Sequence, residues 1–251
     1  MRSKAVLFGI NYVRTPEARL RGCVNDVNNM ADYLKTSGGF DVVETYTDET
    51  NYHSVTGKAI INTLYRLGVE SHRRRLERVW IHFSGHGTSI RDYDGDECDR
   101  KDECILPSDY DTRGVITDDL IKRLLRVFHE NTKVTCIFDC CHSGTIGDLK
   151  YKYVSNGKCI RDNHFVSCKA NILMISGCKD DQTSADAYNV QGRRTFTGAM
   201  TSCLLLALRN NSSTKIFKVI DNLRSFLRSK RYSQVPQLTS SFELTDETCI
   251  L

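Results

Sequence analysis

The sequence contains few of the residues that separate domains. Only three prolines occur in 251 residues, and no Ser- or Gly-rich linker, acidic tract or internal repeat interrupts the chain. Hydrophobic residues make up 40% of the sequence, which at this length fits one large core and leaves no room for two. We therefore expect a single domain over residues 1–251.

Long apolar runs are also missing. The first sixteen residues carry only one short run, residues 6–8 before Gly9, which is too short for the hydrophobic region of a secretory signal. No later stretch reaches the length of a membrane span. These absences predict a soluble, cytoplasmic protein with no membrane partner.

The charge is weak and dispersed. The net charge is +4, and the one concentrated basic run, residues 72–78, lies between an amphipathic segment and an apolar run. Such a run is more typical of a solvated helix end or loop than of a surface for an acidic partner. Because no aromatic-rich basic platform accompanies it, we do not expect nucleic acid to be a partner.

The eleven cysteines lack any CxxC spacing. This absence argues against a structural zinc site and against a thiol oxidoreductase. The cysteines are scattered over a chain whose apolar content can build a core without disulfides, so reduced thiols are the better interpretation.

Short apolar runs alternate with segments of helical period. The runs are rich in β-branched residues and short enough to be strands buried on both faces, at 5–10, 42–46, 79–83, 134–138 and 172–175. Helical periodicity marks residues 24–34, 55–67 and 117–128 between them, and 196–208 and 215–227 after them, before an extended piece at 236–242. The order predicts an α/β fold, a three-layer αβα sandwich with a mainly parallel central sheet. The polar segments 89–113 and 149–169 are expected to be long loops.

A cysteine and a histidine follow two of these predicted strands. His86 stands in Ser84-Gly85-His86-Gly87, and Cys141 stands in the sequence DCCHSG at 139–144. The carboxyl ends of parallel strands open onto one crevice, and the separation of 55 residues (141 − 86) is close to the spacing of about 50 in caspases.

This pair has the chemistry of a peptidase. A free thiol is mostly protonated at neutral pH, and a neighbouring imidazole can remove its proton and later protonate the departing amine. Backbone amides, for which Gly87 and Cys141 are the candidates, would hold the oxyanion. The alternative for any one cysteine is a buried core position. The residues alone leave open which of Cys140 and Cys141 attacks, although consecutive side chains of an extended segment point to opposite faces.

Taken with several other strings, these motifs resemble those of metacaspases, the caspase relatives of plants, fungi, protists and bacteria. The resemblance spans most of the chain and rests on the His and Cys motifs together with residues 9–12, 20–26, 105–107, 116–119, 176–187 and 234–240. It implies a caspase-like cysteine endopeptidase in which Cys141, directly before the His of its motif, is the nucleophile. The chain resembles the compact, type I-like catalytic core, without a prodomain.

The resemblance also implies the specificity. It places Asp26 and Asp139 in the substrate-binding pocket, with Cys23 and Ser84 as smaller wall residues. Buried carboxylates hold Arg and Lys by charge-assisted hydrogen bonds, so we expect polypeptide substrates with Arg or Lys before the scissile bond. Without the family, Asp26 is more typical of a first-turn helix acid.

Calcium is implied in the same way. Metacaspase ligand positions match Asp102, Asp118, Asp119 and Asp148, and hard cations prefer such oxygen ligands. The acidic stretch 92–103 is not an EF-hand. Counted from Asp94, an EF-hand needs Gly at the sixth position and Glu at the twelfth, where this sequence has Asp99 and Ile105. Without the family, Thr117 followed by two acids reads as a capped helix start, and both roles can coexist.

Two further expectations complete the interpretation. The basic residues Lys150, Lys152, Lys158, Arg161 and Lys169 suggest that the protein cleaves itself in this segment. We also expect the protein to act as a monomer. The alternative function is a catalytically weak pseudoenzyme or a calcium-dependent interaction scaffold on the same fold.

Overall fold

The computed structural model describes residues 2–91, 101–140, 149–154, 159–161, 168–177, 186–188, 196–210 and 214–251. Its centre is an eight-stranded sheet in the order β2-β1-β3-β7-β10-β13-β8-β9. The first five strands are parallel and the last three run antiparallel to their neighbours. In chain order the strands are β1 Ser3–Gly9, β2 Val42–Thr47, β3 Arg78–Ser84, β7 Lys133–Asp139, β8 Tyr151–Tyr153, β9 Cys159–Arg161, β10 Asn171–Ser176 and β13 Gln237–Ser240.

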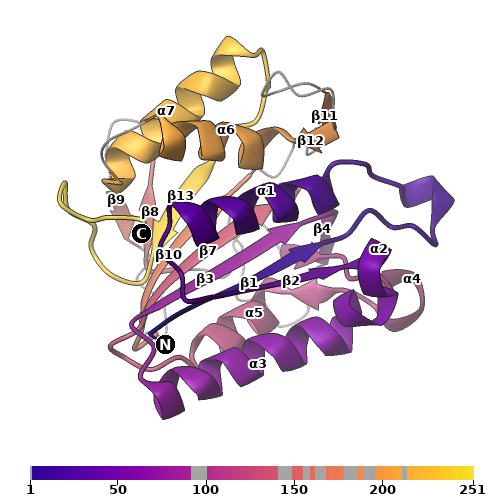
Figure 1. Ribbon diagram of the computed structural model, residues 1–251, viewed down its shortest axis with the longest axis horizontal. Helices are drawn as coiled ribbons and strands as arrows, with labels where there is room; N and C mark the ends of the chain where they lie inside the picture. The colour runs from indigo at the N-terminus through magenta and orange to yellow at the C-terminus, as the bar shows by residue number, and fades with distance from the viewer. Residues whose placement is uncertain are drawn as a thin grey trace.

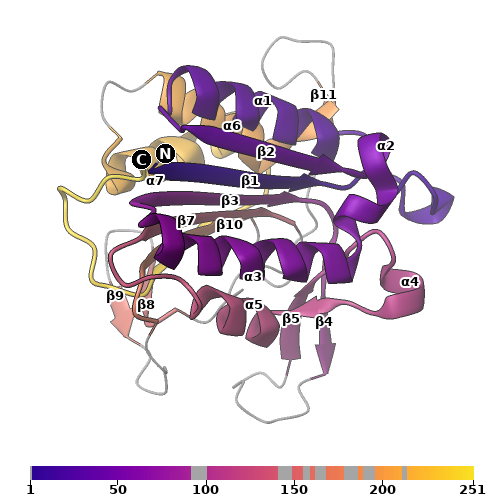
Figure 2. The ribbon, with the colours of Figure 1, turned by 60° about the horizontal axis from the view of Figure 1, so that its bottom comes forward.

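Helices cover both faces of this sheet. One layer consists of α1 (Cys23–Thr36), α6 (Ala199–Arg209) and α7 (Ile216–Ser229), and the other of α3 (Gly57–Arg74) and α5 (Asp118–Leu125), as Figures 1 and 2 show. Residues of β3 pack against both helix layers: Trp80 packs on the α1 side, whereas Ile81 and Phe83 pack on the α3 side. The predicted αβα sandwich with a mainly parallel sheet is confirmed.

The two segments expected to be long loops contain strands. Residues 89–113 contribute to a three-stranded antiparallel sheet of β4 (Gly87–Arg91), β5 (Lys101–Ile105) and β6 (Ile116–Thr117), and the short α4 (Tyr110–Arg113) lies between β5 and β6. Strands β8 and β9 form a hairpin within 149–169. The loop prediction was therefore wrong there, because these strands are short and rich in polar residues and lack the apolar runs of the central strands.

Most predicted helices are confirmed, with one boundary corrected. Residues 196–198 were expected to be helical but form β12 (Phe196–Gly198), which pairs with β11 (Asp186–Tyr188), and α6 begins only at Ala199. The remaining short elements are α2 (Asp48–Asn51) and the 3-10 turns Pro16–Ala18 and Tyr52–Val55. Thr117 caps α5 as predicted, since its side chain accepts a hydrogen bond from the Leu120 amide.

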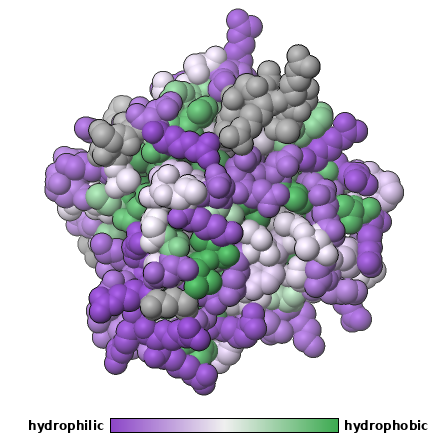
Figure 3. Space-filling model, viewed as in Figure 1, coloured by the Kyte–Doolittle hydropathy of each residue, from purple (hydrophilic) through white to green (hydrophobic). Residues whose placement is uncertain are grey.

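The face of the molecule seen in Figure 3 is mostly hydrophilic, with hydrophobic residues in separate small areas. Within the ranges given above, no helix has both the length and the apolar character needed to cross a membrane.

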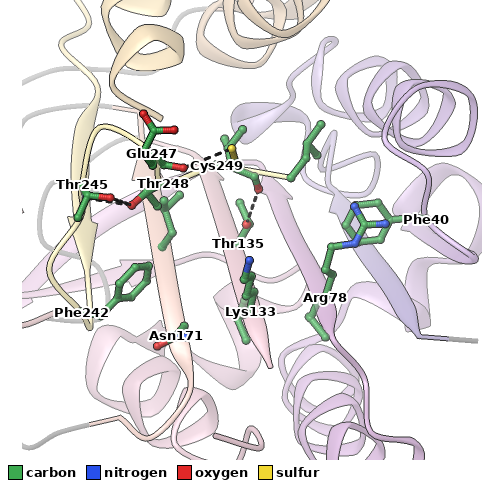
Figure 4. A pocket seen from close by; sticks show the side chains of 15 residues that line it. Phe40, Arg78, Lys133, Thr135, Asn171, Phe242, Thr245, Glu247, Thr248 and Cys249 are labelled. Carbon is green, nitrogen blue, oxygen red and sulfur yellow. Dashed lines mark hydrogen bonds between the residues drawn. The ribbon is translucent and has the colours of Figure 1, made fainter. Parts of the chain in front are cut away.

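The amino ends of the strands are covered by the C-terminal segment. A pocket of about 320 Å³ lies there, between the first residues of β3, β7 and β10 and the last residues of the chain. Figure 4 shows the side chains that line it. Thr135 donates a hydrogen bond to the Ile250 carbonyl at 3.0 Å and so ties this segment to β7. The pocket lies at the opposite ends of the strands from His86 and Asp139, and we assign it no part in the chemistry.

Candidate active site

The register of the parallel strands brings three chain segments to one point. Gly9 at the end of β1 lies opposite Ser84 at the end of β3, and Ser84 lies opposite Asp139 at the end of β7. The carboxyl ends of parallel strands are where α/β sheets bind their ligands. His86 and the segment beginning at residue 140 leave the sheet at this edge.

His86 is held in one orientation. Its backbone N–H donates to the Tyr12 hydroxyl at 2.7 Å, and its Nε2 lies 2.7 Å from the Ala18 carbonyl oxygen. A carbonyl oxygen only accepts hydrogen bonds, so Nε2 carries the proton and Nδ1 carries the lone pair. The basic atom of His86 is therefore Nδ1.

Tyr12 supports this histidine from two directions. Its ring centroid lies 4.6 Å from that of His86, and its hydroxyl donates to the Leu106 carbonyl at 2.8 Å. Burial raises the pKa of Tyr12 well above its ordinary value, so the hydroxyl keeps its proton.

Tyr12 has a φ of 54°, an unusual value for a bulky residue. Asp48 stabilises this conformation, because its two carboxylate oxygens accept the amides of Asn11 and Val13, each at 2.9 Å. Strain of this kind persists only where the surroundings enforce it, and here it sets the position of a tyrosine against His86.

The cysteine expected to be the nucleophile, Cys141, lies outside the described residues, as does its amide as an oxyanion donor. Its neighbour Cys140 is fully buried and packs in the core on the α3 side of the sheet. Gly87, the other oxyanion candidate, begins β4 directly after His86.

Several other thiols are unsuited to nucleophilic attack. Burial raises the pKa of Cys203 to about 12, and burial together with nearby acids raises that of Cys104 to about 12. Burial also raises the pKa of Cys136 and Cys168. Since the thiolate is the attacking species, these cysteines are structural.

Asp26 and Asp139 lie side by side beneath the strand ends. Asp26 is in the first turn of α1 and accepts the Ser84 hydroxyl at 2.7 Å and the Gly198 amide at 2.8 Å. Asp139 accepts both the amide and the hydroxyl of Thr201, at 2.8 and 2.7 Å. Both carboxylates are almost completely buried. The amides of Gly198 and Thr201 belong to the amino end of α6, where the helix dipole stabilises negative charge.

Gly198 permits this arrangement. A Cβ atom added there would stand 2.5 Å from Oδ2 of Asp26 and closer still to Oδ2 of Asp139. The two carboxylates therefore converge on a backbone position that has room for no side chain.

The two expected wall residues lie beside these acids. Ser84 is buried and bonded to Asp26, and Cys23 is buried at the start of α1, where its amide donates to the Asn11 side chain at 3.1 Å. Cys23 and Asp26 are three residues apart on one helix and thus share a face.

Three of the four expected calcium ligands fall on β5 and α5. Asp118 is buried, and its carboxylate accepts the Glu103 amide at 3.1 Å and the Asp119 amide at 2.8 Å. The charges of Asp118 and Asp102 both help to raise the pKa of the Cys104 thiol, so both acids lie near that thiol.

Carboxylate oxygens suit a hard cation such as calcium. Among the described residues, however, the His, Cys, Asp and Glu side chains form no group of three that could hold a metal ion. Asp148 lies outside the described residues. The donor chemistry fits calcium, while the described side chains alone do not complete a site.

Three contributors to the site were not predicted from the sequence. These are the Ala18 carbonyl, Gly198 and Thr201, which contact residues 68, 172 and 62 positions away in the chain. A backbone carbonyl and a glycine carry no motif, and Thr201 falls within a helical pattern that reads simply as core.

Comparison with known proteins gives one family. Residues 3–150 match the model of the metacaspase peptidase C14 domain. Metacaspase-3 of Trypanosoma brucei brucei is 36% identical over 256 residues, covering 95% of this chain and 71% of the relative. Metacaspase-1B of Aspergillus oryzae is 34% identical over 293 residues, covering 97% and 68%.

Solved structures share the fold. The structure of protein GSU0716 from Geobacter sulfurreducens has a TM-score of 0.69 at 24% identity and covers 98% of this chain and 95% of that one. Caspase-1 from Spodoptera frugiperda has a TM-score of 0.61 at 13% identity, with 95% and 88% covered.

Proposed function

Because the chain belongs to the metacaspase family and is thus a cysteine-type peptidase, we propose that it cleaves polypeptides after Arg or Lys through Cys141 and His86. The observation that carries the specificity is the pair of buried carboxylates, Asp26 and Asp139, at the strand ends that lead to His86. A guanidinium or ammonium group complements this charge, whereas an Asp side chain would be repelled.

The orientation of His86 supports its role in the chemistry. Its Nδ1 takes the proton of the Cys141 thiol, and the thiolate attacks the scissile carbonyl carbon. The amides of Gly87 and Cys141 stabilise the oxyanion. His86 then protonates the departing amine, which leaves a thioester, and next removes a proton from the water that hydrolyses it. The Ala18 carbonyl, 2.7 Å from Nε2, stabilises the imidazolium that forms at each transfer.

The burial of Cys140 supports the choice of its neighbour as nucleophile. The Cys140 side chain is inaccessible within the core on the α3 side, so its thiol is not exposed to a substrate. The Cys140→Ser variant is therefore expected to keep its activity, while Cys141→Ala loses it.

Calcium is proposed as the activating ion. Asp102, Asp118, Asp119 and Asp148 would hold it, and its charge would relieve the repulsion between the acids around Cys104. Asp102 lies in β5 rather than in the loop expected there, so we expect calcium to act on the segment that carries Asp148 and so to complete the active site.

Self-processing is proposed for the segment between β8 and β9. Lys150 directly precedes β8 and Lys152 lies within it. Strand β8 pairs with β13 of the main sheet, so cleavage at Lys152 would require that strand to detach. Lys158, a further candidate position, lies outside the described residues. Incubation of the wild-type protein with calcium should yield fragments that Cys141→Ala does not yield.

Reporter peptides test the proposed function. Peptides ending in Arg, Lys or Asp would be given, with calcium or with a chelator, to the wild-type protein and to Cys141→Ala. We expect calcium-dependent release from the Arg and Lys peptides by the wild type alone. Release from none of them by a folded, calcium-bound protein would favour the alternative, an interaction scaffold, and faster release from the Asp peptide would overturn the proposed specificity.

A further inference from the structure

A second histidine is buried in the sheet behind the candidate pocket. His82 lies in the middle of β3, between Leu7 of β1 and Ile137 of β7, and is fully buried. It is neither at a strand end nor in contact with the crevice that His86 enters. The chemistry proposed above makes no use of it.

His82 is joined to Asp139 by a chain of hydrogen bonds. Its Nε2 lies 3.2 Å from the Thr201 hydroxyl, and that hydroxyl donates to Oδ2 of Asp139 at 2.7 Å. A hydroxyl has a single hydrogen, and Thr201 gives it to the carboxylate. The contact with His82 is therefore one in which Thr201 accepts, so Nε2 of His82 carries the proton.

Packing does not explain a histidine at this position. Burial lowers the pKa of His82 to about 3, so the ring is neutral, and its Nδ1 has no hydrogen-bond partner within the described part of the chain. A buried nitrogen without a partner destabilises the fold relative to an apolar side chain of similar shape. Among the described residues, the only hydrogen bond of the His82 side chain is the one to Thr201, and this bond is what the histidine contributes.

We propose that His82 is a positioning residue for substrate specificity: through Thr201 it holds the Asp139 carboxylate in the orientation that receives the basic side chain of the substrate. This inference rests on the proposed function. The His82 donor fixes the lone pair of Thr201, and the hydroxyl hydrogen is thereby directed at Asp139. Without that donor the hydroxyl can rotate, and Asp139 loses a hydrogen bond for part of the time.

The test compares a charged with an uncharged substrate. An Arg-ended peptide and its citrulline-ended counterpart have nearly the same shape, but only the Arg peptide carries the positive charge that Asp139 is proposed to bind. A purely structural defect lowers activity toward both peptides equally. A positioning defect raises KM for the Arg peptide alone and narrows the Arg-to-citrulline ratio of kcat/KM.

Two variants interrupt the chain of hydrogen bonds. His82→Leu removes the bond from His82 to Thr201, and Thr201→Val removes the hydroxyl and with it both bonds. We expect each variant to raise KM for the Arg peptide by roughly tenfold, the effect of about one hydrogen bond, with kcat nearly unchanged. The double variant should lose little more than either single variant. Thr201→Ser keeps the hydroxyl and His82→Gln can supply an N–H donor, so both should recover most of the loss.

Ser202→Ala is the matched control. Ser202 is the next residue of α6, is equally buried, and its hydroxyl has no hydrogen-bond partner among the described residues. Its removal should leave both substrates unaffected.

Two results would overturn the inference: folded His82→Leu that matches Ser202→Ala, or equal losses toward both peptides. If His82→Leu does not fold, His82→Phe, which also lacks the N–H donor, decides by the same criteria. If the wild type itself does not cleave the Arg peptide, it is the proposed function that fails.

Discussion

The convergence of two carboxylates on Gly198 gives the sharpest prediction. The Gly198→Ala variant adds one methyl group 2.5 Å from Oδ2 of Asp26 and closer to Oδ2 of Asp139. The backbone of Gly198 is fixed at the amino end of α6, and the backbone of Asp26 is fixed in the first turn of α1. The carboxylates themselves must therefore move.

The size of the effect follows from this displacement. Ordinary contact lies near 3.4 Å, so Oδ2 of Asp26 must retreat by about 1 Å, and a misplacement of that size in an active site lowers the rate roughly a hundredfold. The Gly198 amide also lies within hydrogen-bond distance of both Asp26 oxygens, at 2.8 and 2.9 Å. Weakening a hydrogen bond to a buried charge should lower the free energy of unfolding by about 2 kcal/mol.

The assay measures kcat/KM for an Arg-ended peptide together with urea unfolding. Gly57→Ala is the control, because a Cβ at Gly57 meets its nearest neighbour, Pro107, at 3.4 Å, which is ordinary contact. Gly57 is the first residue of α3, where alanine is a good helix former. We expect the control to keep its activity and its stability.

A Gly198→Ala protein that cleaves the Arg peptide within twofold of the wild-type rate would refute the reasoning. Such a result would mean that the two carboxylates either are free to move or take no part in binding the substrate. An equal loss in Gly57→Ala would instead show that the effect is not specific to the pocket.

Three other predictions follow from the same contacts. Tyr12→Phe removes the hydroxyl that accepts the His86 amide and should lower kcat about tenfold with KM little changed, measured by steady-state kinetics; a change in KM alone would contradict it. His82 has its pKa lowered to about 3 when folded against about 6.5 when unfolded, so unfolding takes up a proton below pH 6.5 and stability falls on acidification by up to about 1.4 kcal/mol per pH unit. Urea unfolding at pH 7 and pH 5 should show a smaller loss of unfolding free energy for His82→Gln than for the wild type. An equal loss in the two proteins would contradict the assignment. Asp118→Asn should weaken calcium binding, measured by calorimetry, and unchanged affinity would remove Asp118 from the proposed site.

The sequence allowed the central sheet to be predicted because its strands are buried on both faces. Runs such as residues 79–83 have no polar alternation and are too short for helices, so they indicate interior strands. The hairpin β8–β9 and the strand pair β4–β5 were not predicted. Their residues are mostly polar or charged and lack the apolar runs that mark an interior strand, although Cys104 and Ile105 of β5 are buried.

From the local pattern alone the site could be predicted only where it follows a strand, whereas Asp26 and Cys23, on α1, were predicted from the family resemblance. His86 and Asp139 stand just beyond or at the ends of apolar runs, and strand ends meet at one edge. The Ala18 carbonyl and the Thr201 hydroxyl reach the site through contacts 68 and 62 residues long. Such contacts depend on how α6 and the segment after β1 pack on the sheet, which no local pattern encodes.

Covalent labelling would test the central claim most directly. The wild-type protein, with calcium, would react with a peptide chloromethyl ketone ending in Arg or in Asp, and tandem mass spectrometry would identify which of the eleven cysteines carries the peptide. A thiolate activated by His86 beside an acidic pocket predicts a single label from the Arg reagent on Cys141, none in Cys141→Ala, and little reaction with the Asp reagent. Labelling of Cys140, or faster labelling by the Asp reagent, would contradict the account.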